Sequence, residues 1–371
     1  MKLAIACNHS FPHIGGSEKI VHQIAEHMTR LFDWDVCVFS RSIIKKIDHE
    51  KVRYIPCQKT PDGFISQLKK FGPDHTLVYS DCFNYWDDFL KNLEFISGTK
   101  SISLVGMNHM AGRRGSFKMF LSKARDGRIM TITHSDNYRD YIKCSTSGID
   151  VNVIPNGVDI SEFDSDEINF RDVYNLDNRN IILCVSNYFP GKGQEHLPRV
   201  LLGLKKRHDW QCIMISSSVN FMPSKILQKH VKRLMKPLGN NVKFIQDIPR
   251  SHIVAAFNSA SMFVFPSQKE VAPLVLLEAQ ACRLSWIAMP VGNARLLNGG
   301  IILPSPGLNK LGFSSYSPET YRVFTNEIET LLDDPTRRKT LGSNGRNQIE
   351  CEFNWSIIAD QYNEVFSNAK K

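Results

Sequence analysis

Two glutamates eight residues apart have the most readily interpreted chemistry in this sequence. Glu270 and Glu278 flank a run of apolar residues, and a helix that begins near Pro273 would place Glu278 on its second turn and Glu270 in the preceding loop. A carboxylate inside an apolar run is poorly solvated and needs hydrogen-bond partners. We therefore expect both carboxylates to point into one cavity and to accept hydrogen bonds from a hydroxyl-rich ligand. An ion pair of Glu278 with Arg283 or Lys269 is the structural alternative.

A lysine and a glycine pair could bind the phosphates of such a ligand. Lys192 lies on a turn rich in Pro and Gly after a predicted strand, although a solvated surface lysine is the more common explanation of such a residue. Gly15 and Gly16 lie between a predicted strand and a predicted helix. Backbone N–H groups at a helix start bind anions, and glycine lets a ligand approach, although many such turns carry glycine for steric reasons alone. The turn lacks the G-x-G-x-x-G pattern of nicotinamide-binding sites.

The elements that position these residues are short apolar strands alternating with helical patterns. This alternation predicts an α/β fold of two doubly wound, Rossmann-like units facing across a cleft, with ligand sites at the carboxyl ends of parallel strands. We expect one domain over 1–160, with the amphipathic helix 354–371 packing back on it, and a second over 161–353. The predicted strands are 2–7, 35–40, 75–79, 101–105, 128–133, 181–186, 211–216, 242–246, 262–265, 285–289 and 300–303, with a helix over 17–31.

Composition narrows the class of protein. The 371 residues suffice for about two domains, and 42% hydrophobic with 22% charged residues excludes a disordered or collagen-like chain. The longest apolar stretch, Val271 to Val291, contains Glu278 and Arg283, so we expect no membrane span. The apolar run Leu3 to Cys7 is too short for a signal peptide, so we expect the mature chain to start near Met1. Nine cysteines without a C-x-x-C pair indicate free thiols in the cytoplasm and no zinc site.

Over nearly its whole length the chain resembles the family 4 glycosyltransferases, which have the GT-B fold. The matching features occur in the same order as in that family. They are a Gly-Gly-x-Glu turn at Gly15 to Glu18, the segment Ile154 to Asp159, a Lys-Gly loop at Lys192, a Pro-Ser-x-x-Glu-x7-Glu-Ala stretch at Pro266 to Ala279, and Trp355. The resemblance implies a nucleotide-sugar donor and retention of the anomeric configuration. We further expect a glycan or lipid-linked acceptor and no metal cofactor.

The resemblance also assigns roles to individual residues. Gly16 would present its N–H to the donor diphosphate, and Lys192 would neutralise the leaving phosphate. Glu278 would accept hydrogen bonds from the ribose, and Glu270 from the transferred sugar, beside which His109 would lie. The implied catalytic residues are His109, Lys192 and Glu270, and the implied donor-binding residues are Gly15, Gly16, Asn187, Lys192, Glu270 and Glu278. Two Asp-x-Asp strings, Asp33 to Asp35 and Asp164 to Asp166, are interpreted as surface turns and not as metal ligands.

Several positions depart from the family pattern. Asn187 stands where the family usually has an arginine, and an amide cannot replace that charge. Either another cation such as Arg250 or Arg113 reaches the diphosphate, or donor binding is weak. Met110 follows His109 in place of the usual Asp, and Ala272-Pro273 replaces the usual Phe-Gly between the two glutamates.

The net charge of +9 and a basic segment are compatible with an anionic partner other than a nucleotide sugar. The segment could contact anionic lipid at the inner membrane face or a phosphate backbone, or it could be a solvated helix face with an ordinary core stripe. Its residues are Arg113, Arg114, Lys118, Lys123, Arg125 and Arg128, interleaved with Phe117, Met119, Phe120 and Leu121. A GT-B enzyme acting on modified DNA and a sugar-nucleotide or polyanion-binding protein without turnover remain the two alternative functions.

Overall fold

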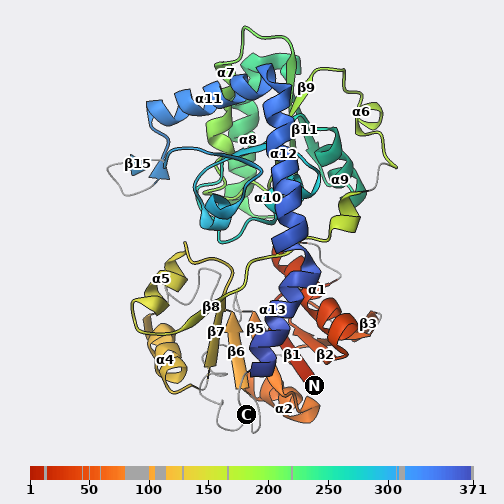
Figure 1. Cartoon of the computed structure of the whole chain (residues 1–371), viewed down its shortest axis with the longest axis vertical. Coiled ribbons are helices and arrows are strands. Elements are labelled where there is room, and N and C mark those ends of the chain that lie inside the picture. The colour runs from red at the N-terminus through yellow and green to blue at the C-terminus, as the bar shows by residue number, and fades with distance from the viewer. Residues whose placement is uncertain are drawn as a thin grey trace. The chain divides into compact units, whose positions relative to one another are not determined.

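The computed structural model is an α/β protein in two compact units. It describes residues 1–11, 15–43, 45–49, 51–58, 60–79, 100–104, 114–127, 129–164, 167–218, 220–305, 307–308 and 314–368. Unit 1 comprises Met1–Gly157 and Trp355–Lys371, and unit 2 comprises Val158–Asn354 (Figure 1). Within the described ranges, none of the helices combines the length and apolar character that a membrane crossing requires.

Unit 1 is built on an eight-stranded sheet in the order β3-β4-β2-β1-β5-β6-β7-β8. All neighbours are parallel except β3, which runs antiparallel to β4. The strands are β1 (Lys2–Cys7), β2 (Asp35–Ser40), β3 (Ile47–His49), β4 (Val52–Pro56), β5 (His75–Tyr79), β6 (Lys100–Leu104), β7 (Ile129–Thr133) and β8 (Val151–Val153). Its described helices are α1 (Gly16–Phe32), α2 (Pro61–Phe71), α4 (Arg114–Arg125), α5 (Arg139–Ser145) and α13 (Trp355–Asn368).

The last helix, α13, belongs to unit 1 although it follows unit 2 in the chain. It packs against α1, where the rings of Trp355 and His27 lie 6.0 Å apart. Trp34, just after α1, donates a hydrogen bond from Nε1 to Asn363 Oδ1 at 3.2 Å, and its ring lies 5.6 Å from that of Phe366. The amphipathic pattern of the C-terminal segment therefore reflects an apolar face buried in unit 1.

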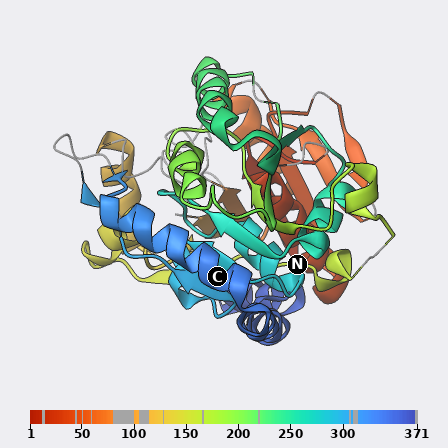
Figure 2. The ribbon, with the colours of Figure 1, turned by 90° about the horizontal axis from the view of Figure 1, so that it is seen from above.

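Unit 2 contains a six-stranded parallel sheet in the order β11-β10-β9-β12-β13-β14, with helices around it (Figure 2). Its strands are β9 (Asn180–Val185), β10 (Trp210–Ser216), β11 (Val242–Gln246), β12 (Met262–Phe265), β13 (Trp286–Ala288) and β14 (Gly300–Ile302), and β15 (Gly307–Leu308) pairs separately with β16 (Ser314–Ser315). Its helices are α6 (Phe170–Val173), α7 (Leu197–Leu202), α8 (Met222–Met235), α9 (Arg250–Ser259), α10 (Leu274–Ala281), α11 (Pro318–Asp333) and α12 (Pro335–Gln348).

The apolar stretch around Glu278 forms part of the core of unit 2. Helix α10 begins at Leu274 with Pro273 as its N-cap, which confirms the predicted helix start. Leu276, Leu277 and the strand β13 are buried. This burial on all sides explains why the segment reads as a continuous apolar run without being a membrane span.

Candidate active site

The strand order of unit 2 changes direction between β9 and β12. From β9 the sheet continues through β10 to β11 on one side, and through β12 to β13 and β14 on the other. Loops leaving the carboxyl ends of β9 and β12 therefore diverge, and parallel α/β sheets bind ligands in the crevice formed at this point. The loop after β9 contains Lys192, and the loop after β12 contains Glu270.

Lys192 and Glu270 form an ion pair between these two loops. Lys192 Nζ lies 2.6 Å from Glu270 Oε1, and the side chains are 30% and 13% exposed. Ser267 Oγ donates a second hydrogen bond to the same oxygen at 2.7 Å. Both donors therefore converge on Oε1. The structure thus brings together two of the residues singled out in the sequence, which lie 78 residues apart.

Two glycines with positive φ allow the Glu270 loop to lie against neighbouring backbone. Gly193 has φ 76°, and a Cβ there would overlap the carbonyl of Pro266. Gly292 has φ 50°, and a Cβ there would overlap the carbonyl of Val271. Side chains are excluded by strain and by lack of space at both positions. The loop is consequently held by close backbone packing at both of its ends.

Glu278 is buried on α10 and paired with an arginine from the start of α9. Arg250 Nη2 donates to Glu278 Oε1 at 2.6 Å, and Arg250 Nε donates to Glu162 Oε1 at 2.7 Å. Burial disfavours the charged guanidinium, but the carboxylates of Glu278 and Glu162 outweigh it and raise the pKa of Arg250. Among the described residues, Glu278 therefore forms its ion pair with Arg250, and not with Arg283 or Lys269 as the structural alternative supposed. Arg250 was one of the cations expected to reach the diphosphate. Its guanidinium group instead binds the carboxylates of Glu162 and Glu278.

Asn187 connects the loops that follow β9 and β10. Its Oδ1 accepts a hydrogen bond from the Ser217 N–H at 2.7 Å. Its carbonyl accepts one from Gln194 Nε2 at 3.0 Å, and Gln194 also donates to the Ser186 carbonyl at 3.2 Å. The Asn187 side chain therefore fixes backbone, and nothing in these contacts supplies the charge of the arginine that it replaces.

Comparison with known proteins identifies the family to which this part of the chain is similar. Residues 166–348, which cover most of unit 2, match the family model for glycosyl transferases group 1. This chain belongs to the group 1 glycosyltransferases. The match includes Asn187, Lys192, Glu270 and Glu278, so the site lies within the part of the chain that the family model covers.

Several curated relatives of this group 1 glycosyltransferase are named for acceptors that contain inositol. The GDP-mannose-dependent monoacylated alpha-(1-6)-phosphatidylinositol monomannoside mannosyltransferase of Corynebacterium glutamicum is 26% identical over 58% of this chain and 55% of its own length. The D-inositol 3-phosphate glycosyltransferase of Kineococcus radiotolerans is 26% identical over 58% of this chain and 51% of its own length. The chain thus spans about half the length of these two relatives. An uncharacterized glycosyltransferase of Methanocaldococcus jannaschii matches at 22% identity over 99% of this chain.

Solved structures show that the fold extends over the whole chain. The sucrose-phosphate synthase of Thermosynechococcus elongatus superposes with a TM-score of 0.80 at 21% identity, over 99% of this chain and 98% of its own. Anabaena HepE in complex with UDP-glucose gives a TM-score of 0.74 at 17% identity, over 99% of both chains. At these identities the likeness establishes the fold, which is the predicted GT-B arrangement of two Rossmann-like domains.

The remaining predicted site residues of the glycosyltransferase belong to unit 1. Helix α1 begins at Gly16, and Gly15 precedes it in extended conformation; both are exposed. Exposed N–H groups at the start of a long helix can bind an anion, as expected for this turn. The side chain of Glu18 lies against Gly15. His109 lies outside the described residues, as do Met110 and Arg113.

The basic segment of the glycosyltransferase directs its apolar side chains into unit 1. Phe120 on α4 is fully buried, and Phe117, Met119 and Leu121 pack against the same core cluster. Lys118 is exposed. This arrangement is that of an ordinary core-facing helix with a solvated basic face, so the apolar residues of α4 do not provide a lipid-inserting surface.

The described aspartates of the two Asp-x-Asp strings lie at the ends of helices and strands, and the interpretation as surface turns is wrong for Asp35, which is the first residue of β2. Asp33 follows α1 in the left-handed region with φ 55°, and Asp35 pairs with Arg53. Asp164 accepts a hydrogen bond from Arg346 Nη1 at 2.8 Å, and the last aspartate of that string lies outside the described residues. Asp35 and Asp164 therefore each pair with an arginine.

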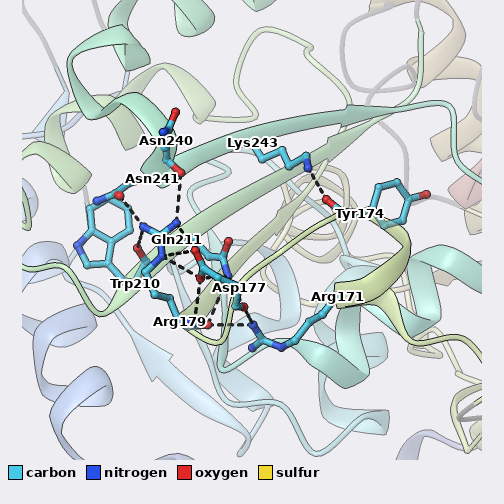
Figure 3. Close-up of polar contacts among 9 residues, drawn as sticks. All are labelled: Arg171, Tyr174, Asp177, Arg179, Trp210, Gln211, Asn240, Asn241 and Lys243. Atoms are coloured by element: carbon cyan, nitrogen blue, oxygen red, sulfur yellow. Dashed lines mark hydrogen bonds and ion pairs between the residues drawn. The ribbon is translucent and has the colours of Figure 1, made fainter.

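Another polar network lies at the opposite edge of the unit 2 sheet, around the amino ends of β9, β10 and β11 (Figure 3). Arg179 donates to Asp177, to the Trp210 carbonyl at 3.2 Å and to Asn241 Oδ1 at 2.6 Å. Arg171 donates to the carbonyls of Asp177 and Arg179. Both guanidinium groups thus bind backbone and neighbouring side chains, which makes the network a structural support and not a second site.

A half-buried histidine contacts the loop that carries Glu270. His196 stacks on Tyr316 with centroids 4.0 Å apart, and its Nδ1 lies 2.7 Å from Tyr321 Oη. Gln268 Nε2 lies 2.8 Å from His196 Nε2. Because an amide nitrogen can only donate, Nε2 must accept and Nδ1 must carry the proton. Burial lowers the pKa of His196 to about 4, so the ring is neutral near pH 7.

We predict that acidification destabilises the protein between pH 6.5 and about 4. His196 and His134 both have a pKa lowered from 6.5 to about 4 by burial. The unfolded chain therefore binds protons in this range that the folded chain does not, and stability is lost as the pH falls through it. Each histidine contributes up to about 1.4 kcal/mol per pH unit to the slope of the free energy of unfolding against pH.

Urea unfolding at a series of pH values measures this slope, and His196→Gln should reduce it. An unchanged slope in that variant would contradict the assignment of His196.

Proposed function

We propose that this group 1 glycosyltransferase moves a hexose from a nucleoside diphosphate hexose to a glycan or lipid-linked acceptor, with retention of the anomeric configuration. The observation that carries the proposal is the convergence of Lys192 and Ser267 on one oxygen of Glu270 at the point where the unit 2 sheet changes direction. The names of two relatives, with GDP-mannose as donor and phosphatidylinositol mannosides as acceptors, support this class of substrates.

Each described side chain has a defined part in the proposed reaction. Lys192 Nζ stabilises the negative charge on the departing phosphate, a contribution that is often the largest single term in catalysis. Glu270 uses Oε1 for Lys192 and Ser267, which leaves Oε2 to accept a hydrogen bond from a hydroxyl of the hexose. The bond between the anomeric carbon and the phosphate oxygen breaks, and the acceptor oxygen bonds to that carbon from the same face. The departing phosphate oxygen takes the acceptor proton.

Donor binding in this proposal relies on less positive charge than in the family pattern. Asn187 bonds to Ser217, and Arg250 bonds to Glu162 and Glu278. Among the described residues of unit 2, Lys192 then supplies the positive charge for the diphosphate. A sugar-nucleotide-binding protein without turnover could have the same affinity for the donor. Only the formation of products distinguishes it from a glycosyltransferase.

A donor screen followed by a transfer assay tests the proposal. A ligand at a hundred times its Kd adds about 2.7 kcal/mol to stability, so the thermal shift of purified protein with a panel of nucleoside diphosphate hexoses should identify the donor. The expected result is transfer of labelled hexose to phosphoinositides or oligosaccharides, with release of the nucleoside diphosphate.

Nucleotide binding with neither transfer nor hydrolysis would favour the binding protein. A salt-sensitive gel shift with duplex DNA, and glucosylation of modified DNA alone, would favour the DNA-modifying alternative.

We predict that Glu278→Gln weakens nucleoside diphosphate binding by about tenfold, because a hydrogen bond to a carboxylate is stronger than one to an amide by roughly 1 to 1.5 kcal/mol. Isothermal titration of the nucleoside diphosphate measures the effect. Glu162→Gln is the matched control, since it weakens the other ion pair of Arg250 but leaves Glu278 intact. Equal losses in the two variants would show that the effect passes through Arg250 and that Glu278 does not contact the ribose.

A further inference from the structure

Helix α8 of unit 2 begins with apolar side chains that are open to solvent. Phe221, Met222 and Ile226 are 47%, 66% and 61% exposed. Phe189, from the loop that also carries Lys192, is 36% exposed, and its ring lies 6.2 Å from that of Phe221. These residues form one surface, here called the α8 surface, and exposed apolar clusters of this kind mark interaction sites more often than single exposed residues do.

The rest of the α8 surface is basic. Residues 217–241 contain no Asp or Glu, but they contain Lys225, Lys229, Lys232, Arg233 and Lys236. In the described part of the chain these cations contact only uncharged groups: Lys225 Nζ donates to Asn220 Oδ1 at 2.9 Å, and Lys232 Nζ lies 5.4 Å from the Phe244 ring centroid. Their charge is therefore not neutralised by any described carboxylate.

The other face of α8 holds the helix to unit 2. Ser224, Val231 and Met235 are buried, and Leu227 packs against the core. The buried and exposed residues follow different stripes of the same helix, so folding does not require the exposed apolar side chains. The α8 surface thus lies on a helix whose opposite side is anchored in the core of unit 2.

We propose that the α8 surface docks the protein on an anionic lipid surface. Lysine and arginine flanking exposed Phe, Met and Ile on one helix are the groups that bind headgroups and enter the acyl boundary together. A nucleic acid would engage the cations but would gain little from Met222 and Ile226. Helix α4 lacks this combination, because its apolar side chains lie in the core of unit 1. Docking goes beyond the proposed transfer reaction, and it would bring the Lys192 loop, through Phe189, to the lipid surface.

Vesicle cosedimentation of the full chain tests the proposal without donor or acceptor. The wild type should bind vesicles of phosphatidylcholine and phosphatidylglycerol in equal parts but not vesicles of phosphatidylcholine alone. Lys225→Gln with Lys229→Gln should weaken binding by about tenfold to thirtyfold, because each lysine near such a surface contributes about 1 kcal/mol. Met222→Ser with Ile226→Ser should weaken it at least about tenfold, since both side chains leave water on insertion.

The matched controls change exposed residues elsewhere on unit 2. Lys205→Gln with Lys206→Gln removes the same charge, and Val173→Ser removes an apolar side chain that is also exposed. Both controls should bind vesicles like the wild type. The proposal is overturned if the wild type does not bind anionic vesicles, or if the control pair loses as much binding as the α8 pair. It is also overturned if Met222→Ser with Ile226→Ser abolishes self-association in light scattering while vesicle binding persists, because the surface is then an interface between copies.

Discussion

Replacing Lys192 by alanine should reduce kcat by about a hundredfold or more, which corresponds to about 2.7 kcal/mol of transition-state stabilisation. The loss follows from the position of the ammonium group, which lies at the carboxyl end of β9 and contacts Glu270 at 2.6 Å. An ammonium placed there acts on charge that develops as the phosphate leaves, so kcat should fall more than donor affinity. Steady-state kinetics with the donor found in the thermal-shift screen measures both quantities.

Lys269→Ala is the control for this prediction. Lys269 is adjacent to Glu270 in the sequence, is exposed and carries the same charge. Its removal changes the net charge of the protein equally but leaves the ion pair of Lys192 intact, so kcat should stay within about twofold of the wild type. Equal losses in Lys192→Ala and Lys269→Ala would assign the effect to the general electrostatic field and remove Lys192 from the mechanism.

Gly193→Ala should lower the free energy of unfolding by about 2 to 4 kcal/mol. A residue other than glycine in the left-handed region costs roughly 1 kcal/mol, and overpacking costs about 1 to 3 kcal/mol more. Both apply here, because Gly193 has φ 76° and its added Cβ would overlap the Pro266 carbonyl. The clash also displaces the loop that carries Glu270, so donor binding should weaken together with stability. Urea unfolding and donor titration measure the two effects.

Gly191→Ala separates backbone strain from steric overlap. Gly191 also has a positive φ, 91°, but its added Cβ would meet only the Lys269 side chain at 3.8 Å. Only the conformational cost of roughly 1 kcal/mol remains at this position. If both variants lose the same stability and donor affinity, close packing of Gly193 on Pro266 does not shape the site.

Local sequence patterns predicted the elements that carry the site. The apolar run between Glu270 and Glu278, with Pro273 at its start, predicted α10 and placed Glu278 on its second turn. Strands such as β9 and β12 are buried throughout most of their length, and continuous apolar runs bounded by turn residues are readily recognised. By contrast, β3, β4 and β8 are short strands with half-buried residues, and their sequences lack the continuous apolar run that indicates a buried strand.

Partners that come together through the fold could not be predicted in the same way. Arg250 pairs with Glu162, 88 residues before it, and with Glu278, 28 residues after it, and no local pattern encodes such spacings. The alternative partners considered for Glu278, Lys269 and Arg283, were sequence neighbours that lie just outside the two ends of α10. The importance of Gly292 was not predicted for a related reason. Glycine is required there because the Val271 carbonyl leaves no space for a Cβ, and Val271 is distant in the sequence. A single glycine after a strand gives no sign of that contact.

A crystal structure of the protein with its nucleoside diphosphate hexose bound would test the central claim most directly. We predict that a diphosphate oxygen lies within hydrogen-bond distance of Lys192 Nζ, that a ribose hydroxyl donates to Glu278, and that a hexose hydroxyl donates to Glu270. Nucleotide bound at another edge of the sheet, with Lys192 still paired only to Glu270, would contradict the account.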